Sequence, residues 1–318
     1  MEYITLANSD LTVSRLCIGG DPMGGHGWGV VQESDLLEAV QAGIDAGINF
    51  FDTADIYGLG RAEELLGKAL GGKRKNVIIA TKFGVRRNHS NTESYYDNSP
   101  KWIRTAIEGS LQRLQTDYID LYQVHYRDGQ TPIADIIGTL DCLQREGKIR
   151  YFGLSNIHLQ SISELLPYKG KFVSFQNEYS LAKRDLENEI QSISETLDAT
   201  PMTWGSLGQG ILTGKYGPDV KFDKNDRRSR AVYTNFHGEK LKNNLRIVEC
   251  LSDIGSSYGK TPAETAIRFI LDYLPQSAVL VGVKNKKQVL DNCGACNWKL
   301  TGADIARLCE VSKWREEA

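Results

Sequence analysis

Short apolar runs of strand length alternate along this chain with stretches whose apolar residues recur at helical spacing. The expected strands cover residues 16–20, 48–51, 77–82, 118–124, 149–154, 172–175, 201–204 and 277–281. Helical patterns separate them at residues 34–46, 61–70, 99–114, 131–143, 158–166, 186–197, 241–258 and 261–273, and residues 286–295 and 303–314 follow the last strand. Strands that alternate with helices in this way indicate βαβ units and a parallel sheet.

Two architectures are built from such units, the doubly wound sheet and the (β/α)8 barrel. The dinucleotide fingerprint of a doubly wound sheet should follow the first strand, but residues 19–25 read GGDPMGG and lack the G-x-G-x-x-G pattern. We therefore predict a (β/α)8 TIM barrel, for which about 250 residues is typical. We expect residues 1–318 to form a single domain, with an N-terminal β-hairpin over residues 1–15 and a C-terminal helix within residues 301–318.

The composition excludes several classes of protein. Hydrophobic residues make up 41% of the chain and charged residues 25%, as in soluble globular proteins. A formal net charge of −2 argues against a general binder of nucleic acid or of anionic membranes. No apolar run reaches the length of a membrane span and no signal peptide opens the chain, so a cytoplasmic protein is expected.

Six scattered cysteines are typical of reduced thiols rather than of a disulfide framework. Cys293 and Cys296 have the spacing of a redox motif, but no strand leads into them. A second such pair, which a zinc site would need, is absent from the sequence. We interpret the two cysteines as packed thiols and expect no metal site.

Four residues whose side chains could take part in a reaction follow three neighbouring strands. Asp52, Lys82 and His125 stand where the second, third and fourth strands end, and Tyr57 lies in the loop after the second. Each also has a purely structural interpretation. Asp52 could cap a turn and Lys82 could be a solvated strand end. His125 could hydrogen-bond to a backbone carbonyl, and Tyr57 could be a surface aromatic. In a barrel the carboxyl ends of the strands meet at one mouth, so their coincidence favours a shared function.

The chemistry of these four residues suits reduction of a carbonyl. The developing alkoxide needs a proton donor, and tyrosine, with an ordinary pKa of about 10, is a poor acid at neutral pH. We expect the ammonium of Lys82 to lower the pKa of Tyr57, and Asp52 to keep Lys82 charged and aimed. His125 would donate to the substrate oxygen. No side chain supplies a hydride, so a nicotinamide is the expected source.

These segments resemble the aldo-keto reductase family. FFDTADIYG matches the Asp and Tyr motif of the family, IATKFG its Lys motif and DYIDLYQVH its His motif, and the likeness runs from the first strand to Trp298. The resemblance implies a (β/α)8 barrel and hydride transfer between NAD(P)H and a carbonyl or alcohol. It assigns proton donation to Tyr57, tuning of that donor to Lys82 and Asp52, and orientation of the substrate to His125.

The resemblance also implies a cofactor site along the later strand ends. Ser155, Asn156 and Gln176 would hold the nicotinamide carboxamide, and Trp204 would stack on its ring in place of the more usual tyrosine. The pyrophosphate loop would run through Gly205, Ser206, Leu207, Gly208, Gly210, Leu212 and Lys215. The adenosine end would meet Gly282, Lys284, Gln288 and Asn292, and Lys284 beside a helix start favours NADP(H) over NAD(H).

Two cofactor segments depart from the pattern of the family or allow a second interpretation. After the first strand, Gly20 is followed by Asp21, whose carboxylate would lie near the nicotinamide ribose or the substrate, with no role assigned. Residues 221–230 are rich in cations and in isolation resemble a nucleic-acid patch, but they also contain two acids. We interpret residues 205–235 as a loop that covers the cofactor, with Arg227 or Arg228 on phosphate.

The loops around the mouth should choose the substrate. Candidates are residues 24–30 with Trp28, residues 84–98 with Arg86, Arg87, Tyr95 and Tyr96, and Tyr126-Arg127, beside Tyr57 and His125. Their aromatic and donor groups indicate a polar, sugar-like carbonyl or an acidic one. Three alternatives stay open: oxidation of a sugar or alcohol by the same residues, a cofactor-binding regulatory subunit, and a non-enzymatic binder. The last is weakened because all four catalytic residue types are present.

Overall fold

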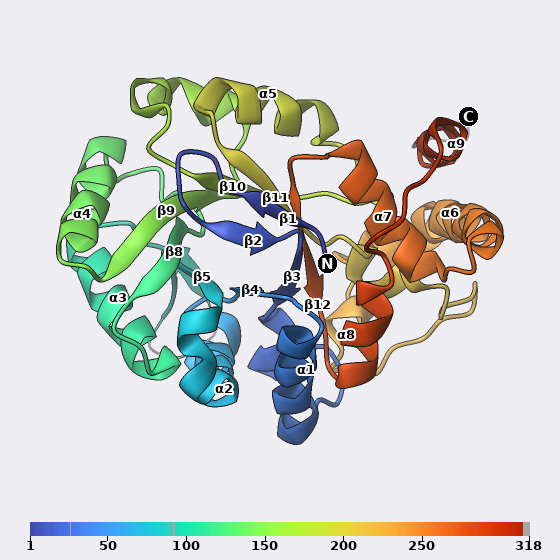
Figure 1. Ribbon diagram of the computed structural model, residues 1–318, viewed down its shortest axis with the longest axis horizontal. Helices are drawn as coiled ribbons and strands as arrows, with labels where there is room; N and C mark the ends of the chain where they lie inside the picture. Colours follow the sequence, from blue (N-terminus) through green and yellow to red (C-terminus); the bar gives the residue numbers. More distant parts are fainter. Residues whose placement is uncertain (26, 89, 91–92, 314–318) are drawn as a thin grey trace.

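Eight parallel strands close into a barrel in the computed structural model, which describes residues 1–313 except 26, 89, 91 and 92. Strand pairing follows the chain from β3 to β12, and β12 pairs with β3 to close the ring (Figure 1). The predicted (β/α)8 barrel is thereby confirmed. The strands are β3 Leu16–Gly19, β4 Phe50–Asp52, β5 Ile78–Phe83, β8 Ile119–Val124, β9 Ile149–Ser155, β10 Ser174–Glu178, β11 Thr200–Trp204 and β12 Ala278–Gly282.

Helices surround this barrel on its outside, as Figure 1 shows. Further helices lie beyond that ring, where α9 packs against α6 and carries the C-terminal end of the described chain. Residue 314, which the sequence places at the end of the last helix, lies outside the described residues. The helices are α1 Glu33–Asp45, α2 Arg61–Leu70, α3 Pro100–Leu114, α4 Ile133–Arg145, α5 Glu187–Leu197, α6 Gly238–Ser257, α7 Pro262–Tyr273, α8 Lys286–Cys293 and α9 Gly302–Val311.

Two apolar cores hold the fold together. The larger lies between the strands and the surrounding helices, and the smaller fills the inside of the barrel. The N-terminal hairpin, β1 Tyr3–Thr5 paired with β2 Thr12–Ser14, adds Leu6, Leu11 and Val13 to the inner core. This hairpin lies across the ring of strands (Figure 1) and closes one end, so the mouth at the carboxyl ends of the strands is left for chemistry.

Two stretches differ from the sequence prediction. Residues 84–98, expected to be a polar loop, contain an antiparallel pair, β6 Val85–Arg87 and β7 Ser94–Tyr96. Arg86 lies opposite Tyr95 in that pair, and its guanidinium carbon is 5.2 Å from the centre of the tyrosine ring. Residues 158–166, expected to be an α-helix, form the 3-10 turns η4 Leu159–Glu164 and η5 Leu166–Tyr168, because Pro167 cannot continue an α-helix.

The sequence predicts an N-cap at Ser99 and another at Thr131, each followed by a proline, and a capping box over residues 261–264. The first and the last of these predictions are confirmed, and the one at Thr131 is wrong. Ser99 caps α3 by accepting from the backbone of Trp102, and Thr261 forms the predicted capping box at α7. Before α4, however, Pro132 is the cap residue, and Thr131 does not cap. Pro132, with φ −54° and ψ 138°, stays outside the helix, so α4 begins one residue later than predicted, and the Thr131 hydroxyl donates to the carboxylate of Asp128 at 2.7 Å.

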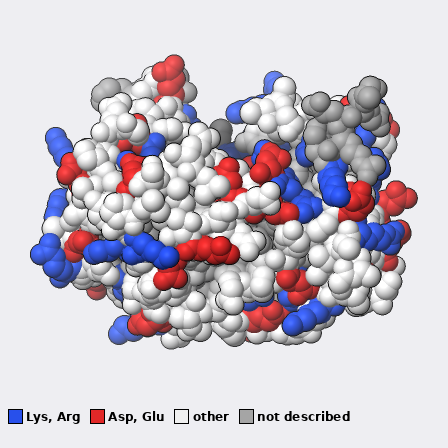
Figure 2. Space-filling model, turned by 90° about the horizontal axis from the view of Figure 1, so that it is seen from above, with Lys and Arg blue, Asp and Glu red and all other residues white. Residues whose placement is uncertain are grey.

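Residues 205–235 contain no α-helix or strand, and short 3-10 turns hold them together. These turns are η6 Gly208–Thr213, η7 Arg227–Ser229 and η8 Thr234–Phe236. On the face drawn in Figure 2, acidic and basic side chains are interspersed rather than gathered into a field of one sign. Among the described residues, none of the helices combines the length and apolar character needed to cross a membrane.

Candidate active site

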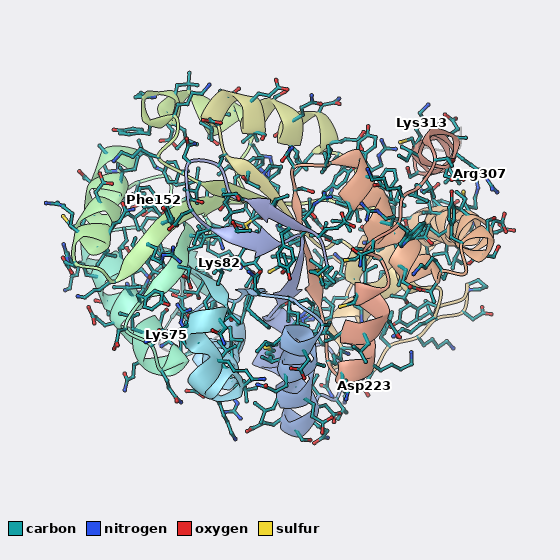
Figure 3. The ribbon with its side chains drawn as sticks, viewed as in Figure 1. Lys75, Lys82, Phe152, Asp223, Arg307 and Lys313 are labelled. Atoms are coloured by element: carbon teal, nitrogen blue, oxygen red, sulfur yellow. The ribbon has the colours of Figure 1, made fainter. Side chains whose placement is uncertain are left out.

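A buried ion pair lies at the carboxyl ends of β4 and β5. Lys82 is fully buried and donates through Nζ to Asp52 Oδ1 at 2.5 Å and to the Thr53 carbonyl at 2.9 Å. Lys82 lies within the ring of strands, whereas the labelled Lys75 and Asp223 lie at the edge of the molecule (Figure 3). Burying two charges requires close pairing and further hydrogen bonds, and this pair has both.

The second oxygen of Asp52 is held by two side-chain amides. Gln123 Nε2 on β8 and Gln176 Nε2 on β10 donate to Asp52 Oδ2 at 3.0 and 2.9 Å. Gln176 was expected at the nicotinamide, while the sequence analysis missed Gln123. A signal for Gln123 exists in its spacing, because it precedes His125 by two residues and therefore shares a strand face with it.

Tyr57 and His125 complete the group above the ion pair. Tyr57 begins the short turn η2 Tyr57–Gly60, its ring centre 5.8 Å from that of His125 in an edge-on arrangement. Lys82 Nζ lies 5.2 Å from the centre of the Tyr57 ring. The four residues predicted to be catalytic, which come from three strand ends and one turn, are thus brought together.

Burial is the largest cause of the pKa shifts of Tyr57 and His125. Burial raises the pKa of Tyr57 well above its ordinary value, and the charges of Asp21 and Asp52 raise it further. The pKa of Tyr57 is thus raised, whereas the sequence predicts that Lys82 lowers it. Burial and the charge of Lys82 hold the pKa of His125 well below its usual value, so its imidazole is neutral. Within the described chain, His125 Nδ1 has no hydrogen-bond partner.

An aromatic stack leads from His125 to the β6–β7 hairpin. The ring of Tyr126 lies 5.1 Å from that of His125, and the ring of Tyr96 lies 5.0 Å from that of Tyr126. The hairpin therefore supports one wall of the site. Its candidate loop residues 89, 91 and 92, like residue 26 of the loop before α1, lie outside the described residues.

A long cleft of about 1760 Å³ opens above these residues. Ligand pockets are usually about 300–1,000 Å³, so this space accommodates a dinucleotide together with a small substrate. Of the substrate candidates, Trp28, Tyr57, Arg87, His125 and Tyr126 line it, whereas Arg86, Tyr95, Tyr96 and Arg127 do not. Every residue predicted to bind the cofactor lines it except Gly208 and Leu212. Both are buried and lie off the cleft, and Lys82 is enclosed beneath its floor.

The residues expected to hold the carboxamide meet beside Trp204. Asn156, with a positive φ of 54°, accepts from Trp204 Nε1 at 3.2 Å and donates to the His125 carbonyl at 3.1 Å. Ser155 Oγ donates to the Gln176 carbonyl at 3.2 Å. Asn156 thus connects the predicted stacking residue with the strand that carries His125.

Cations gather at the far end of the cleft. The pKa of Lys284 is lowered by burial first and then by the nearby charges of Arg228 and Lys215, and Asp226 opposes this effect. Gln288 accepts from the Lys284 backbone at 2.8 Å. Crowded cations of this kind are stabilised by a polyanion such as a phosphate group, so the donor set suits the phosphate end of a nucleotide cofactor.

Residues 205–235 reach the loop before α1 across the cleft. The Arg227 backbone donates to the Gly27 carbonyl at 3.0 Å, and the Arg227 guanidinium contacts Asp21 Oδ2 at 3.3 Å. The guanidinium carbon of Arg227 is also 5.0 Å from the centre of the Trp28 ring. These contacts join the two sides of the cleft.

Glu178 is a further cleft residue that the sequence analysis missed. Burial raises its pKa, and its Oε1 accepts from Gln209 Nε2 at 3.2 Å. Its signal also lies in strand spacing, since Glu178 follows Gln176 by two residues on β10.

Comparisons with known proteins agree with this geometry. The model of the aldo/keto reductase family matches residues 15–313. An aldo-keto reductase of Bacillus subtilis is 33% identical over 307 residues, which covers 96% of this chain and 91% of the relative. An NADH-specific methylglyoxal reductase of Escherichia coli is 31% identical over 327 residues, covering 98% and 99%. The solved structure of a glycerol dehydrogenase from Gluconobacter oxydans is 30% identical, with a TM-score of 0.88 and coverage of 97% and 94%.

The barrel, the four clustered residues and these similarities lead to one conclusion. The chain belongs to the aldo/keto reductase family and is an NAD(P)H-dependent oxidoreductase.

Proposed function

We propose that this protein reduces an aldehyde or ketone to an alcohol, with Tyr57 as the proton donor. The observation that carries the proposal is the meeting of Tyr57, His125 and the Lys82–Asp52 pair on the floor of one cleft. When bound, the nicotinamide supplies the hydride. The protein must then orient the carbonyl and deliver a proton to its oxygen.

The residues divide that work between them. Because the pKa of Tyr57 is raised, its hydroxyl keeps its proton until the developing alkoxide takes it. The Lys82 ammonium, 5.2 Å from the ring centre, stabilises the phenolate that remains. Asp52 holds Lys82 in place, and the neutral imidazole of His125 donates an N–H to the same substrate oxygen.

NADP(H) is the proposed cofactor in preference to NAD(H). Lys215, Lys284 and Arg228 crowd the far end of the cleft, and a 2′-phosphate would relieve their mutual repulsion. The NADH-specific relative shows that members with this degree of identity use either cofactor. The preference therefore rests on the local charges.

The proposed substrate is a polar or sugar-like carbonyl compound. Trp28, Arg87 and Tyr126 line the cleft near Tyr57 and offer both aromatic surface and hydrogen-bond donors. Oxidation of a polyhydroxy alcohol is the second candidate, because the similar Gluconobacter structure is a glycerol dehydrogenase. The same four residues serve both directions, since the phenolate of Tyr57 accepts the proton that the phenol donates.

Turnover by wild type and Tyr57→Phe tests the mechanism. The consumption of NADPH and NADH is followed with a set of aldehydes and ketones, and the affinity for NADPH is measured separately. We expect Tyr57→Phe to bind NADPH normally but to lose about 10²–10⁴-fold in kcat. Tyr118→Phe, at the opposite end of β8 from His125, is the matched control and should turn over normally. Full activity of Tyr57→Phe would contradict the proposal.

A further inference from the structure

Asp21 places a carboxylate in the same cleft as Tyr57 and His125. It begins the turn η1 Asp21–Gly24, directly after β3. After burial, Asp21 is the group that raises the pKa of Tyr57 most, ahead of Asp52. Since both side chains line one cleft and the turns that carry them are packed together, a substrate whose carbonyl oxygen meets the Tyr57 hydroxyl can present a neighbouring group to Asp21.

Two glycines fix the relative positions of Asp21 and Tyr57. A Cβ on Gly24 would lie 2.7 Å from the Gly58 nitrogen, and a Cβ on Gly58 would lie 2.7 Å from the Gly24 Cα. Gly58 also has a φ of 59°, in the left-handed region that glycine tolerates. The turn that carries Asp21 is therefore packed backbone to backbone against the turn that carries Tyr57.

The two oxygens of Asp21 have different surroundings. Oδ2 accepts from Trp28 Nε1 at 2.8 Å and contacts Arg227 at 3.3 Å. Oδ1 accepts no hydrogen bond from the described residues, and the side chain is 34% exposed to the cleft. The contacts of Oδ2 thus fix the orientation of the carboxylate, and Oδ1 is left as a hydrogen-bond acceptor in the cleft.

The chemistry of this acceptor restricts its partner. A carboxylate repels phosphate, so Asp21 does not suit the pyrophosphate of the cofactor. Arg227 already offsets its charge, so a cation is not required. A neutral hydroxyl group, on the substrate or on the nicotinamide ribose, is a donor that a partly neutralised, accessible carboxylate oxygen binds well.

We infer that Asp21 Oδ1 forms a subsite for a hydroxyl group on the carbon adjacent to the reacting carbonyl, and so selects α-hydroxy carbonyl substrates. This inference rests on the proposed reduction and names its substrate class. Trp28 and Arg227 act as positioning residues, because they orient the carboxylate through its other oxygen.

The test compares glyceraldehyde with propanal, which has the same carbon chain without the hydroxyl groups. The measured quantity is the ratio of kcat/KM for the two substrates, in wild type, Asp21→Asn and Asp21→Ser. We expect the ratio to favour glyceraldehyde in wild type and to fall about ten-fold or more in both variants, because a hydrogen bond to a charged group is lost. Effects of the substitution on Tyr57, and the hydration of each aldehyde, act equally across the comparison and cancel.

Asp185→Asn is the matched control, since Asp185 is another acid that lines the cleft. Its ratio should stay at the wild-type value. Wild type that reduces both aldehydes, with an unchanged ratio in the Asp21 variants, would overturn the inference and leave the reduction intact. The Asp21 variants could also bind NADPH more weakly while the ratio of kcat/KM for the two aldehydes stays unchanged. That result would assign Asp21 to the cofactor ribose or to the Arg227 contact, and it would overturn the inference as well. Wild type that reduces no carbonyl compound would remove the proposed function itself.

Discussion

Gln176 Nε2 donates to Asp52 Oδ2 at 2.9 Å, so an amide that was expected at the nicotinamide is bonded to the buried Lys82–Asp52 ion pair. Gln123 donates to the same oxygen at 3.0 Å. Asp52 therefore faces Lys82 with one oxygen and two neutral amides with the other. This arrangement orients the carboxylate through both oxygens without adding a second charge.

Replacing Gln123 by leucine should slow the reaction without disturbing the cleft. Gln123 is fully buried and does not line the cleft, so its loss should lower kcat and leave the KM for NADPH near the wild-type value. The lost bond to a charged group should also reduce the free energy of unfolding by about 1–3 kcal/mol. Steady-state kinetics and urea denaturation measure the two effects.

Ser110→Ala separates a positioning role from general destabilisation. Ser110 is buried in α3, and in the described chain its hydroxyl has no hydrogen-bond partner. It should leave kcat unchanged. A Gln123→Leu enzyme that loses stability but keeps its kcat would show that Gln123 is structural only.

Asp52→Asn should be costly for both folding and turnover. The substitution leaves the buried Lys82 ammonium without a counter-charge, because the side-chain amide of asparagine is neutral. Breaking a buried pair in this way typically costs about 3–5 kcal/mol. The midpoint of urea denaturation should fall accordingly, whereas Asp141→Asn, which breaks the surface pair with Lys171, should barely move it. Equal shifts for the two variants would contradict this account.

The predicted parts of the fold and site share one physical basis. Alternating apolar runs specify a barrel, and barrel topology brings the carboxyl ends of its strands to one mouth. Asp52, Lys82 and His125 could therefore be placed together from the sequence before any contact was known. The resemblance to the family added the residues along the cofactor cleft, and all of these but Gly208 and Leu212 line it.

The parts that escaped prediction depend on interactions between segments. The β6–β7 hairpin has strands of three residues, too short for a periodic pattern, and is held by cross-strand contacts such as Arg86 with Tyr95. The bond from Gln123 to Asp52 depends on the relative positions of two strands 71 residues apart in sequence. Thr131 does not cap α4 because Pro132, with φ −54° and ψ 138°, stays outside the helix, which therefore begins at Ile133.

Lys284→Met should weaken NADPH binding more than NADH binding. Loss of a charged hydrogen bond to the 2′-phosphate predicts about a 10–100-fold rise in the Kd for NADPH. The Kd for NADH should change little, because NADH has no phosphate there. Lys287→Met is the control, since Lys287 is exposed and paired with Asp291 at 2.6 Å. An equal loss for both cofactors would show that Lys284 acts only by holding the Trp28 carbonyl, to which its ammonium donates.

The pH dependence should follow the ionisation of Tyr57. Reduction needs the phenol, so kcat/KM for reduction should stay level through neutral pH and fall only as pH rises past the raised pKa of Tyr57. Oxidation needs the phenolate and should rise over the same alkaline range. His125 adds no break near neutral pH, because its lowered pKa keeps it uncharged there.

Asp21→Asn should shift the pH profiles of both reactions in a direction that the structure predicts. Asp21 raises the pKa of Tyr57 and Arg227 lowers it, so removing the carboxylate should bring that pKa down. Both the fall in reduction and the rise in oxidation should then move to lower pH, by the same amount. Profiles of kcat/KM in the two directions, measured with one alcohol and its carbonyl product, test this. A shift of the profiles to higher pH, or a shift in the profile of only one of the two reactions, would exclude Tyr57 as the group that both profiles report.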